Sequence, residues 1–152
     1  MSEDAIKPIL IVEDNADDEL LMIRALRKNN IINEIVVARD GQEALDYLTG
    51  SGSYSGRDLS LMPQIVLLDL KLPKLSGIDV LKRIRSDNRT HLTPVIILTT
   101  SREEDDLVKC YQNGANSYLR KPVDFNAFID VVRHIGIYWL ILNEPPPENR
   151  NI

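Results

Sequence analysis

Three carboxylates and a lysine are the residues of this chain whose positions most directly suggest chemistry. Glu13 and Asp14 follow the apolar run 9–12, Asp69 follows the run 65–68, and Lys121 follows a weaker run at 117–120. Like charges about 4 Å apart repel by roughly 4 kcal/mol at an effective dielectric constant near 20. Three carboxylates in one pocket therefore need a cation or a proton. Few carboxylates with open, water-filled coordination positions suit Mg²⁺ best.

Hydroxyl groups stand at the end of a further apolar run. Thr99 and Thr100 follow the run 95–98 and, together with Lys121, would supply a cation and hydrogen-bond donors for a bound anion. A carboxylate nucleophile, Mg²⁺, a lysine and a hydroxyl are the components of phosphoryl transfer onto an aspartate. The sequence therefore favours chemistry at a phosphoryl group.

Short strands must position these residues. Apolar, β-branched runs of this length are typical of strands buried on both faces of a parallel sheet. The expected strands lie at 8–13, 35–38, 65–69, 95–98 and 117–120, and helical patterns separate them. Five such units predict an α/β fold with a doubly wound, five-stranded parallel sheet. Because parallel strands point the same way, their carboxyl ends share one edge of the sheet, where open α/β sheets bind ligands.

The expected helices carry recognisable start and stop signals. Asn15 or Asp17 is expected to cap a helix that runs to residue 28, Asp40 a short helix that Gly50 ends, and Ser76 a third helix. Further helices are expected at 103–114 and from 124 to about 142, and residues 51–61 are expected to form a surface loop. We expect one domain at 1–142 and a Pro-rich polar tail at 143–152.

Composition narrows the functional classes. The 152 residues carry 18 basic and 23 acidic side chains, a net charge of −5, which argues against a general nucleic-acid binder. The acidic N-terminus has no apolar segment typical of a signal peptide, and no apolar run approaches the length of a membrane span. A single cysteine, Cys110, cannot form an intrachain disulfide. A cytoplasmic protein that binds neither nucleic acid nor membrane is expected.

The last expected helix is apolar on more than one side. One face carries Phe128, Val131, Val132, Ile135, Trp139 and Leu142, enough to cover the sheet. Ile129, Ile137, Tyr138, Leu140 and Ile141 lie largely off that face. We therefore expect a homodimer or partner-docking surface on this helix, together with Tyr111 and Tyr118, against the alternative that the helix packs on its own tail.

Taken together, the motifs resemble those of the response-regulator receiver domain of two-component signalling. The resemblance covers residues 7 to about 140 and rests on IVEDN at 11–15, RDGQEALDYL at 39–48, IVLLDLKLPKLSGIDVLKRIR at 65–85, PVIILTTS at 94–101 and GANSYLRKPVD at 114–124. Any one motif alone would be weak evidence, but the ordered set is specific. The resemblance implies a flavodoxin-like (βα)5 fold with strand order 2-1-3-4-5.

The resemblance also implies a role for each site residue. Asp69 would be the phospho-acceptor, and Glu13, Asp14, Asp69 and the main-chain carbonyl of Lys71 would bind Mg²⁺. Lys121 would contact the phosphoryl group, while Thr99 and Tyr118 would form the switch that responds to it. The peptide bond between Lys121 and Pro122 is usually cis in this family.

The implied function is that of a stand-alone response regulator in a phosphorelay. A partner histidine kinase, of the phytochrome type by the resemblance to phytochrome-linked receivers, would donate the phosphoryl group, and the signal would pass through protein–protein contacts. Such a protein catalyses only its own phosphorylation and dephosphorylation.

Three alternative functions remain. A Mg²⁺-dependent phosphatase of the haloacid-dehalogenase type would use an aspartyl phosphate, but it usually carries a second Asp two residues after the nucleophile, where this chain has Lys71. A flavin-binding module needs a Ser/Thr/Gly-rich phosphate loop, and Glu13 and Asp14 would repel a phosphate in that position. A degenerate receiver that binds partners without phosphorylation is not supported, since every expected site position is filled.

Overall fold

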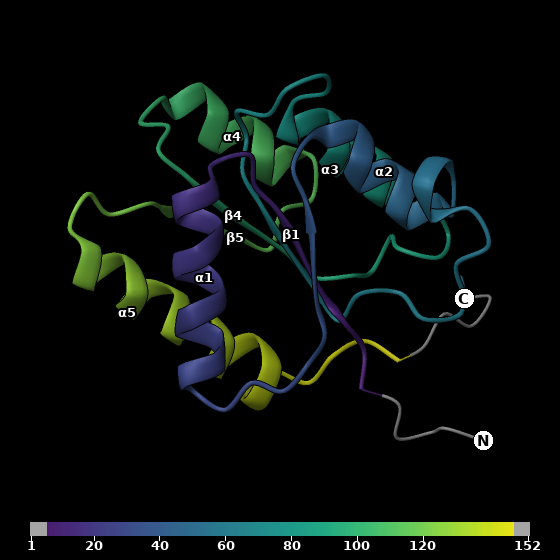
Figure 1. The fold of residues 1–152 in the computed structure, drawn as a ribbon. Helices are drawn as coiled ribbons and strands as arrows, with labels where there is room; N and C mark the ends of the chain where they lie inside the picture. Colours follow the sequence, from purple (N-terminus) through teal and green to yellow (C-terminus); the bar gives the residue numbers. More distant parts are fainter. Residues whose placement is uncertain (1–5, 148–152) are drawn as a thin grey trace.

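A five-stranded parallel sheet forms the centre of the molecule (Figure 1). The computed structural model describes residues 6–147. The strands are β1 (Ile9–Val12), β2 (Ile35–Ala38), β3 (Ile65–Leu68), β4 (Val95–Thr99) and β5 (Ser117–Arg120). They lie in the order β2-β1-β3-β4-β5, and every neighbouring pair is parallel. The predicted fold class and strand order are thus confirmed.

Five α-helices alternate with the strands. They are α1 (Ala16–Lys28), α2 (Gly41–Thr49), α3 (Gly77–Ser86), α4 (Glu104–Gln112) and α5 (Phe125–Gly136). The side chains of Asn15, Asp40, Ser76 and Asp124 each accept a backbone N–H in the first turn of the helix that follows. The predicted caps of the first three helices are therefore confirmed, with Asn15 rather than Asp17 capping α1. Within the loop 51–61, Gly52–Tyr54 form one short 3₁₀ turn.

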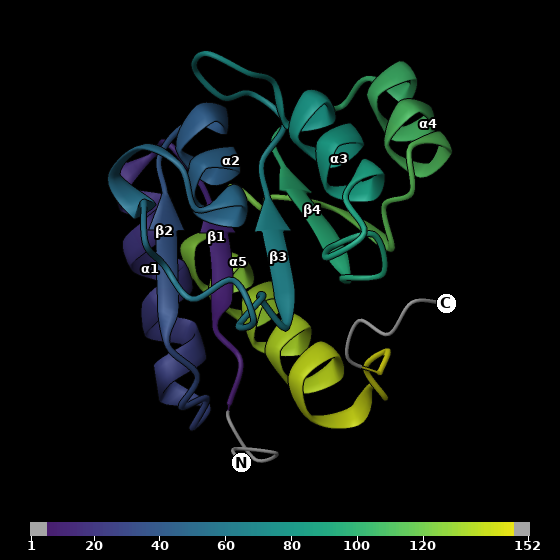
Figure 2. The same ribbon diagram turned by 90° about the vertical axis from the view of Figure 1, so that its right-hand side faces the viewer.

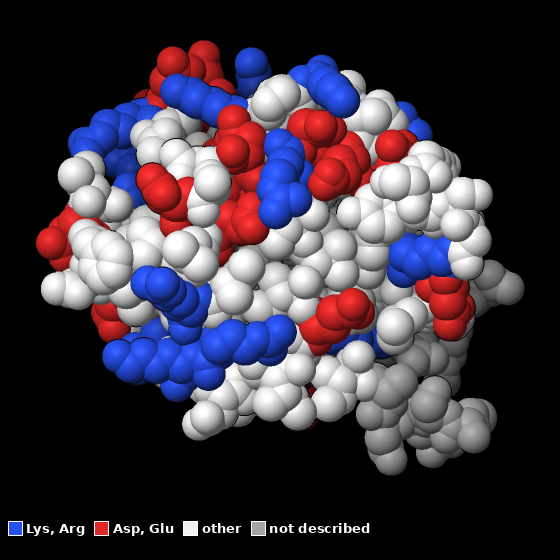
Figure 3. Space-filling model, in the orientation of Figure 1, with Lys and Arg blue, Asp and Glu red and all other residues white. Residues whose placement is uncertain are grey.

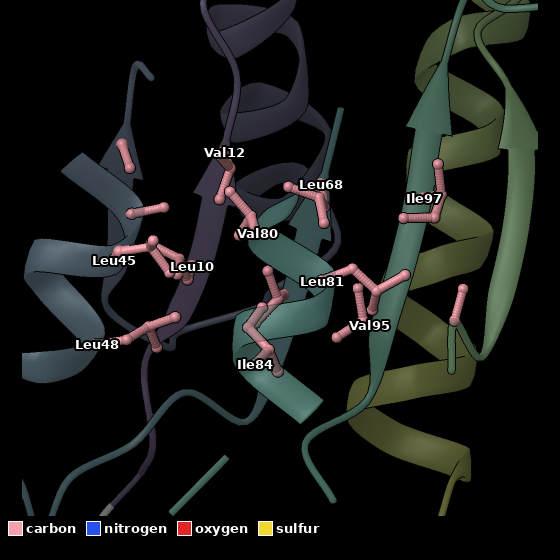
Figure 4. Packing of buried hydrophobic residues seen from close by; sticks show 14 of the residues in the cluster. Leu10, Val12, Leu45, Leu48, Leu68, Val80, Leu81, Ile84, Val95 and Ile97 are labelled. Carbon is pink, nitrogen blue, oxygen red and sulfur yellow. The ribbon is translucent and has the colours of Figure 1, made fainter. Parts of the chain in front are cut away.

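The sheet separates two hydrophobic cores because alternate residues of each strand point to opposite faces. Helices α1 and α5 cover one face, and α2, α3 and α4 cover the other (Figures 1 and 2). Leu10 and Val12 pack under α2 and α3, as Figure 4 shows, whereas Ile9 and Ile11 pack against α1 and α5. The three central strands are buried on both sides, as their continuous apolar sequences predict.

The register of the central strands places the acidic residues side by side. Val12 of β1 pairs with Leu68 of β3, so the residues that follow them, Glu13 and Asp69, leave the sheet at the same edge. Helix α3 begins very near this edge: a Cβ atom on Gly77 would overlap the backbone oxygen of Asp69 and lie 2.6 Å from Cα of Leu70. Only glycine allows this close approach of α3 to the end of β3.

The last helix changes its hydrogen bonding at Ile137. The α-helix α5 ends at Gly136, and a π-helix, η2 (Ile137–Leu142), continues it. Because its wider turns shift the later side chains around the axis, Leu142 lies 67% exposed rather than in the buried face where it was expected. Phe128, Val132 and Ile135 of the predicted face are buried.

The combined segment Phe125–Leu142 spans nearly the length of the helix expected at 124–142 and is apolar enough to resemble a membrane span. Its 18 residues have a mean hydropathy of 1.3, and 22% of them are buried. By length and composition alone such a helix could cross a membrane, which corrects the expectation that no apolar run approaches that length. The expectation considered only uninterrupted apolar runs. The mean hydropathy over 18 residues stays high despite isolated charged residues such as Asp130 and Arg133. The same criterion is met by core helices of soluble domains, and Phe128 and Val132 lie in such a core.

Candidate functional site

An acidic cluster lies at the carboxyl ends of β1 and β3. Glu13, Asp14 and Asp69 each offer a carboxylate oxygen, and these oxygens lie within 4.8 Å of one another. Glu13 and Asp69 are buried, and Asp14 is exposed. The loop backbone fixes two of the carboxylates, since Oδ1 of Asp69 accepts the N–H of Leu70 at 2.6 Å and Oε2 of Glu13 accepts that of Asn15 at 3.1 Å.

The ammonium group of Lys121 lies inside this cluster. Its Nζ donates to Oε1 of Glu13 at 2.5 Å, to Oδ2 of Asp18 at 2.8 Å and to Oδ2 of Asp69 at 3.0 Å. The lysine side chain is only 4% exposed. A buried lysine needs such partners, because desolvation of an unpaired charge is costly. The residue brought here from the end of β5 thus supplies the positive charge that the carboxylates require.

The pKa values of Glu13 and Lys121 depend on burial and on the attraction between the two groups. Burial raises the pKa of Glu13 to about 7, although hydrogen bonding to Lys121 opposes the shift. Burial by itself would lower the pKa of Lys121, but its hydrogen bonds to Asp18 and Glu13 and the charge of Asp69 outweigh that effect and raise the pKa above the ordinary value. The ammonium is therefore charged at neutral pH.

The donor set of the cluster fits a hard divalent cation. All three side chains offer oxygen ligands, which Mg²⁺, Mn²⁺ and Ca²⁺ prefer. The exposure of Asp14 leaves one side of the cluster open to water. Lys71, whose carbonyl was expected to add a ligand, lies at the start of the loop after β3, with its N–H 3.5 Å from Oδ1 of Asp69.

Thr99 lies at the end of β4 and is completely buried. Its Oγ1 accepts the backbone N–H of Ser101 at 3.3 Å, and the hydroxyl of Ser101 donates to Asp106 of α4 at 2.6 Å. The backbone oxygen of Thr99 accepts the N–H of Lys121 at 2.7 Å. A short chain of hydrogen bonds thus joins the hydroxyl expected at the site to the first turn of α4.

Tyr118, the expected switch residue, projects from β5 and is half-buried. Its hydroxyl oxygen is buried without a hydrogen-bond partner among the described residues. Burial raises the pKa of this hydroxyl, although a weak interaction with Ser101 opposes the shift. A buried hydroxyl without a well-formed hydrogen bond is unfavourable, so a conformation that supplies one would be favoured.

One implied detail of the site is wrong. The peptide bond between Lys121 and Pro122 is trans, since no described residue has a cis peptide bond. The ammonium of Lys121 nevertheless reaches the acidic cluster, because its own long side chain spans the distance from β5 to Glu13 and Asp69.

Asp18 is the site residue that the sequence reading did not identify. Acids in a first helical turn are common because they interact favourably with the helix dipole, so nothing in the local sequence distinguishes Asp18 from its neighbours Asp17 and Glu19. Its distance of 2.8 Å from Nζ of Lys121 shows a second role. The available signal was spacing: Asp18 lies four residues after Asp14, in the first turn of α1.

The surface charge around the start of α1 agrees with an acidic site at this edge of the sheet. Red acidic side chains gather in the upper half of Figure 3, the half in which α1 begins in Figure 1. The acids Asp17, Asp18 and Glu19 of the first turn of α1 belong to this end of the molecule. The acidic cluster therefore adjoins a surface that attracts cations.

Comparison with known proteins identifies the same family as the sequence motifs. Residues 9–133 match the response regulator receiver domain. The chain is 44% identical over 138 residues to the probable methanogenesis regulatory protein FilR2 of Methanothrix harundinacea, covering 91% of this chain and 86% of that protein.

Two solved structures share the fold over nearly their whole length. The structure of the phosphorylated cyanobacterial phytochrome response regulator RcpA has a TM-score of 0.87 and 37% sequence identity, covering 94% of this chain and 100% of that one. The Mn²⁺-bound form of response regulator Rcp1 has a TM-score of 0.86 and 35% identity, covering 93% and 99% respectively. These similarities support two-component signalling and do not favour the phosphatase alternative.

Proposed function

Because this chain belongs to the response regulator receiver family, we propose that Asp69 is the residue that accepts the phosphoryl group. The observation that carries the proposal is the convergence of Asp69, Glu13 and Lys121 at one edge of the sheet. A carboxylate beside both a cation-binding cluster and a buried ammonium is placed to hold a phosphoryl group. Helix-capping acids need neither of these neighbours.

The proposed reaction is a transfer between two covalent phosphoryl compounds. An oxygen of Asp69 attacks the phosphorus of a phosphohistidine on a kinase, the new O–P bond forms, and the P–N bond breaks with its electron pair left on the imidazole. Hydrolysis returns Asp69 to its unphosphorylated form, since water attacks the phosphorus and releases inorganic phosphate and the free carboxylate. The chain therefore acts only on its own aspartyl phosphate and not as an enzyme on other substrates.

Glu13, Asp14, Asp69 and the carbonyl of Lys71 would hold the divalent cation, which we propose to be Mg²⁺. When bound, Mg²⁺ neutralises negative charge on the phosphoryl oxygens. Lys121 supplies a further positive charge, and its hydrogen bond to Oδ2 of Asp69 keeps it next to the reacting carboxylate. Both contributions reduce the repulsion between a carboxylate nucleophile and an anionic donor.

Thr99 and Tyr118 would carry the signal away from Asp69. Movement of the Thr99 hydroxyl toward a phosphoryl group breaks its hydrogen bond with the N–H of Ser101. Losing that bond lets Ser101, which is hydrogen-bonded to Asp106 of α4, change position. The buried hydroxyl of Tyr118 can then form a hydrogen bond in the rearranged segment. The signal is then a change in local contacts that biases a two-state surface.

The proposed partners are a histidine kinase and a second copy of this chain. Similarity to phytochrome response regulators supports a phytochrome-type kinase as donor. The acidic net charge supports a protein that binds no nucleic acid, and we propose a cytoplasmic protein that binds no membrane. Residues 1–142 are proposed as the receiver unit and residues 143–152 as a tail. Residues 1–5 of the unit and 148–152 of the tail lie outside the described residues.

A homodimer is proposed through the end of the last helix. Tyr138, Ile141 and Leu142 of η2 are 51%, 62% and 67% exposed. Three large apolar side chains within six residues form a surface that association would remove from water. The widened turns of η2 contribute to this exposure, because they leave Leu142 off the core.

Incubation with acetyl phosphate and Mg²⁺, followed by intact mass and peptide mapping, tests the proposed acceptor. We expect one phosphoryl group per chain on Asp69, and none in Asp69→Asn or without Mg²⁺. Asp105→Asn, which removes an exposed carboxylate of α4, is the matched control and should be phosphorylated normally. A stable adduct on another residue would contradict the proposal, and rapid turnover of generic phosphate esters would favour the phosphatase.

A further inference from the structure

The ammonium of Lys121 has as many carboxylate partners as it has protons. An ammonium group carries three donors, and these reach Glu13, Asp18 and Asp69. Glu13 and Asp69 belong to the group that would hold a divalent cation, whereas Asp18 does not. Asp18 is therefore the partner that stays available to Lys121 when a cation engages the other two.

The position of Asp18 outside the cation-binding group matters because the cation and the Lys121 ammonium repel each other. A divalent cation on Glu13 and Asp69 would share carboxylates with the ammonium, and like charges at such separations repel. The bonds from Lys121 to Glu13 and to Asp69 are both subject to this competition, because both carboxylates belong to the cluster. Without another acceptor, Lys121 would either hinder cation binding or leave the site with its charge unpaired.

The position of Asp18 is fixed by the start of α1. Its backbone N–H donates to the side chain of the capping residue Asn15 at 3.0 Å. Its side chain is 24% exposed, whereas that of Lys121 is 4% exposed, so the carboxylate reaches inward from the helix to the ammonium. The carboxylate of Asp18 is thus held by helix α1 and not by the loop that carries Asp69.

We propose that Asp18 is a positioning residue that keeps the Lys121 ammonium beside Asp69 while Glu13 binds the cation. The proposal rests on the assignment of Asp69 as phospho-acceptor. Asp18 then serves two steps: it makes room for the cation by retaining the displaced ammonium, and it presents that ammonium to the phosphoryl group arriving on Asp69.

A pair of neighbouring variants separates this role from a general effect of charge. Asp18→Asn and Asp17→Asn each remove one acid from the first turn of α1, so both weaken the interaction with the helix dipole equally. Asp17 is exposed and has no side-chain hydrogen bond within the described part of the chain. Asp18→Glu restores the charge, and thermal unfolding confirms that each variant is folded.

Two measurements are compared between the variants. The first is the affinity for Mn²⁺ alone, followed by electron paramagnetic resonance of the free ion, and the second is the rate of phosphoryl uptake from acetyl phosphate at saturating Mg²⁺. We expect Asp18→Asn to lower both by roughly tenfold relative to Asp17→Asn, the effect of losing a hydrogen bond to a charged group. Asp18→Glu should recover most of each loss.

Each other outcome overturns the proposal. Equal Mn²⁺ affinities in Asp18→Asn and Asp17→Asn would show that Asp18 does not help Lys121 make room for the cation. Different affinities with equal uptake rates at saturating Mg²⁺ would show that it does not position Lys121 for the phosphoryl group. If the unmodified chain takes up no phosphoryl group, the proposed function fails, but the Mn²⁺ comparison still tests the first step.

Discussion

Lys121 and Glu13 illustrate how single residues set the charge balance of the site. A buried ammonium and a buried carboxylate are each unfavourable alone, and their contact at 2.5 Å offsets part of both desolvation costs. Asp69 and Asp18 add further negative charge around the same ammonium. The site therefore has an excess of acid that a cation or a proton must balance.

The raised pKa of Glu13 leads to a pH dependence of cation binding. Because burial raises this pKa from 4.5 to about 7, the folded protein holds the proton more strongly than the unfolded chain does. The contribution of Glu13 to stability is therefore lost as pH rises from 4.5 to about 7. A cation bound to the ionised cluster should restore stability above that range, where it need not displace the proton.

We accordingly expect Mg²⁺ to raise the thermal unfolding temperature clearly at about pH 8 and only slightly at about pH 5.5. Differential scanning fluorimetry with and without Mg²⁺ measures this difference. Glu13→Gln cannot ionise, so in this variant the pH dependence should be much smaller. An equal effect of Mg²⁺ at both pH values in the unmodified protein would contradict the assigned shift.

At the scale of elements, the start of α3 determines where the loop after β3 can lie. The backbone of Gly77 approaches that of Asp69 and Leu70 so closely that no side chain fits between them. The N–H of Gly77 also donates to the backbone oxygen of Leu70 at 2.8 Å. The position of Asp69 therefore depends on the packing of α3 as well as on β3.

Gly77→Ala should lower the free energy of unfolding by about 1–3 kcal/mol, because the added methyl group overlaps backbone atoms that cannot rotate away. Urea denaturation measures the loss. Gly136→Ala in α5 is the matched control: its Cβ would meet the flexible end of the Leu26 side chain at 3.1 Å, so a much smaller change is expected. Equal destabilisation by the two substitutions would argue against a rigid contact at Gly77.

At the scale of the whole molecule, the two ends of the sheet serve different purposes. The carboxyl ends of the strands hold the acidic cluster, whereas η2, which carries the exposed apolar side chains, lies beyond the opposite end of α5. The proposed dimer surface is therefore formed by a segment that the site does not need. Association and phosphorylation can then be altered separately.

Leu142→Glu places a charge in the proposed dimer surface and should convert a dimer into a monomer, because a buried unpaired carboxylate is strongly unfavourable. Analytical ultracentrifugation at several concentrations, with and without acetyl phosphate, measures the mass. Val123→Glu, at a side chain that is 96% exposed in the connection before α5, is the control and should leave the mass unchanged. A monomer at the highest concentration, phosphorylated or not, would contradict the homodimer.

The sequence by itself determined the elements and the acidic edge of the sheet. Short, continuous β-branched runs favour strands buried on both faces, and residues such as Asp40 and Ser76 satisfy the free N–H groups at a helix start, so these features depend on local chemistry. Parallel strands also necessarily place Glu13 and Asp69 at one edge. Membership of the receiver family was evident from the spacing of these residues.

Tertiary structure alone decided which charges meet. Lys121 is separated from Glu13 by 108 positions, and its partnership with Asp18 depends on where the fold places the start of α1 relative to the end of β5, which no local pattern encodes. The π-helical turns at Ile137 likewise moved Leu142 out of the predicted face, because periodicity assumes a constant helical turn. Local sequence fixes backbone conformation, whereas the contacts of long side chains depend on the packing of distant elements.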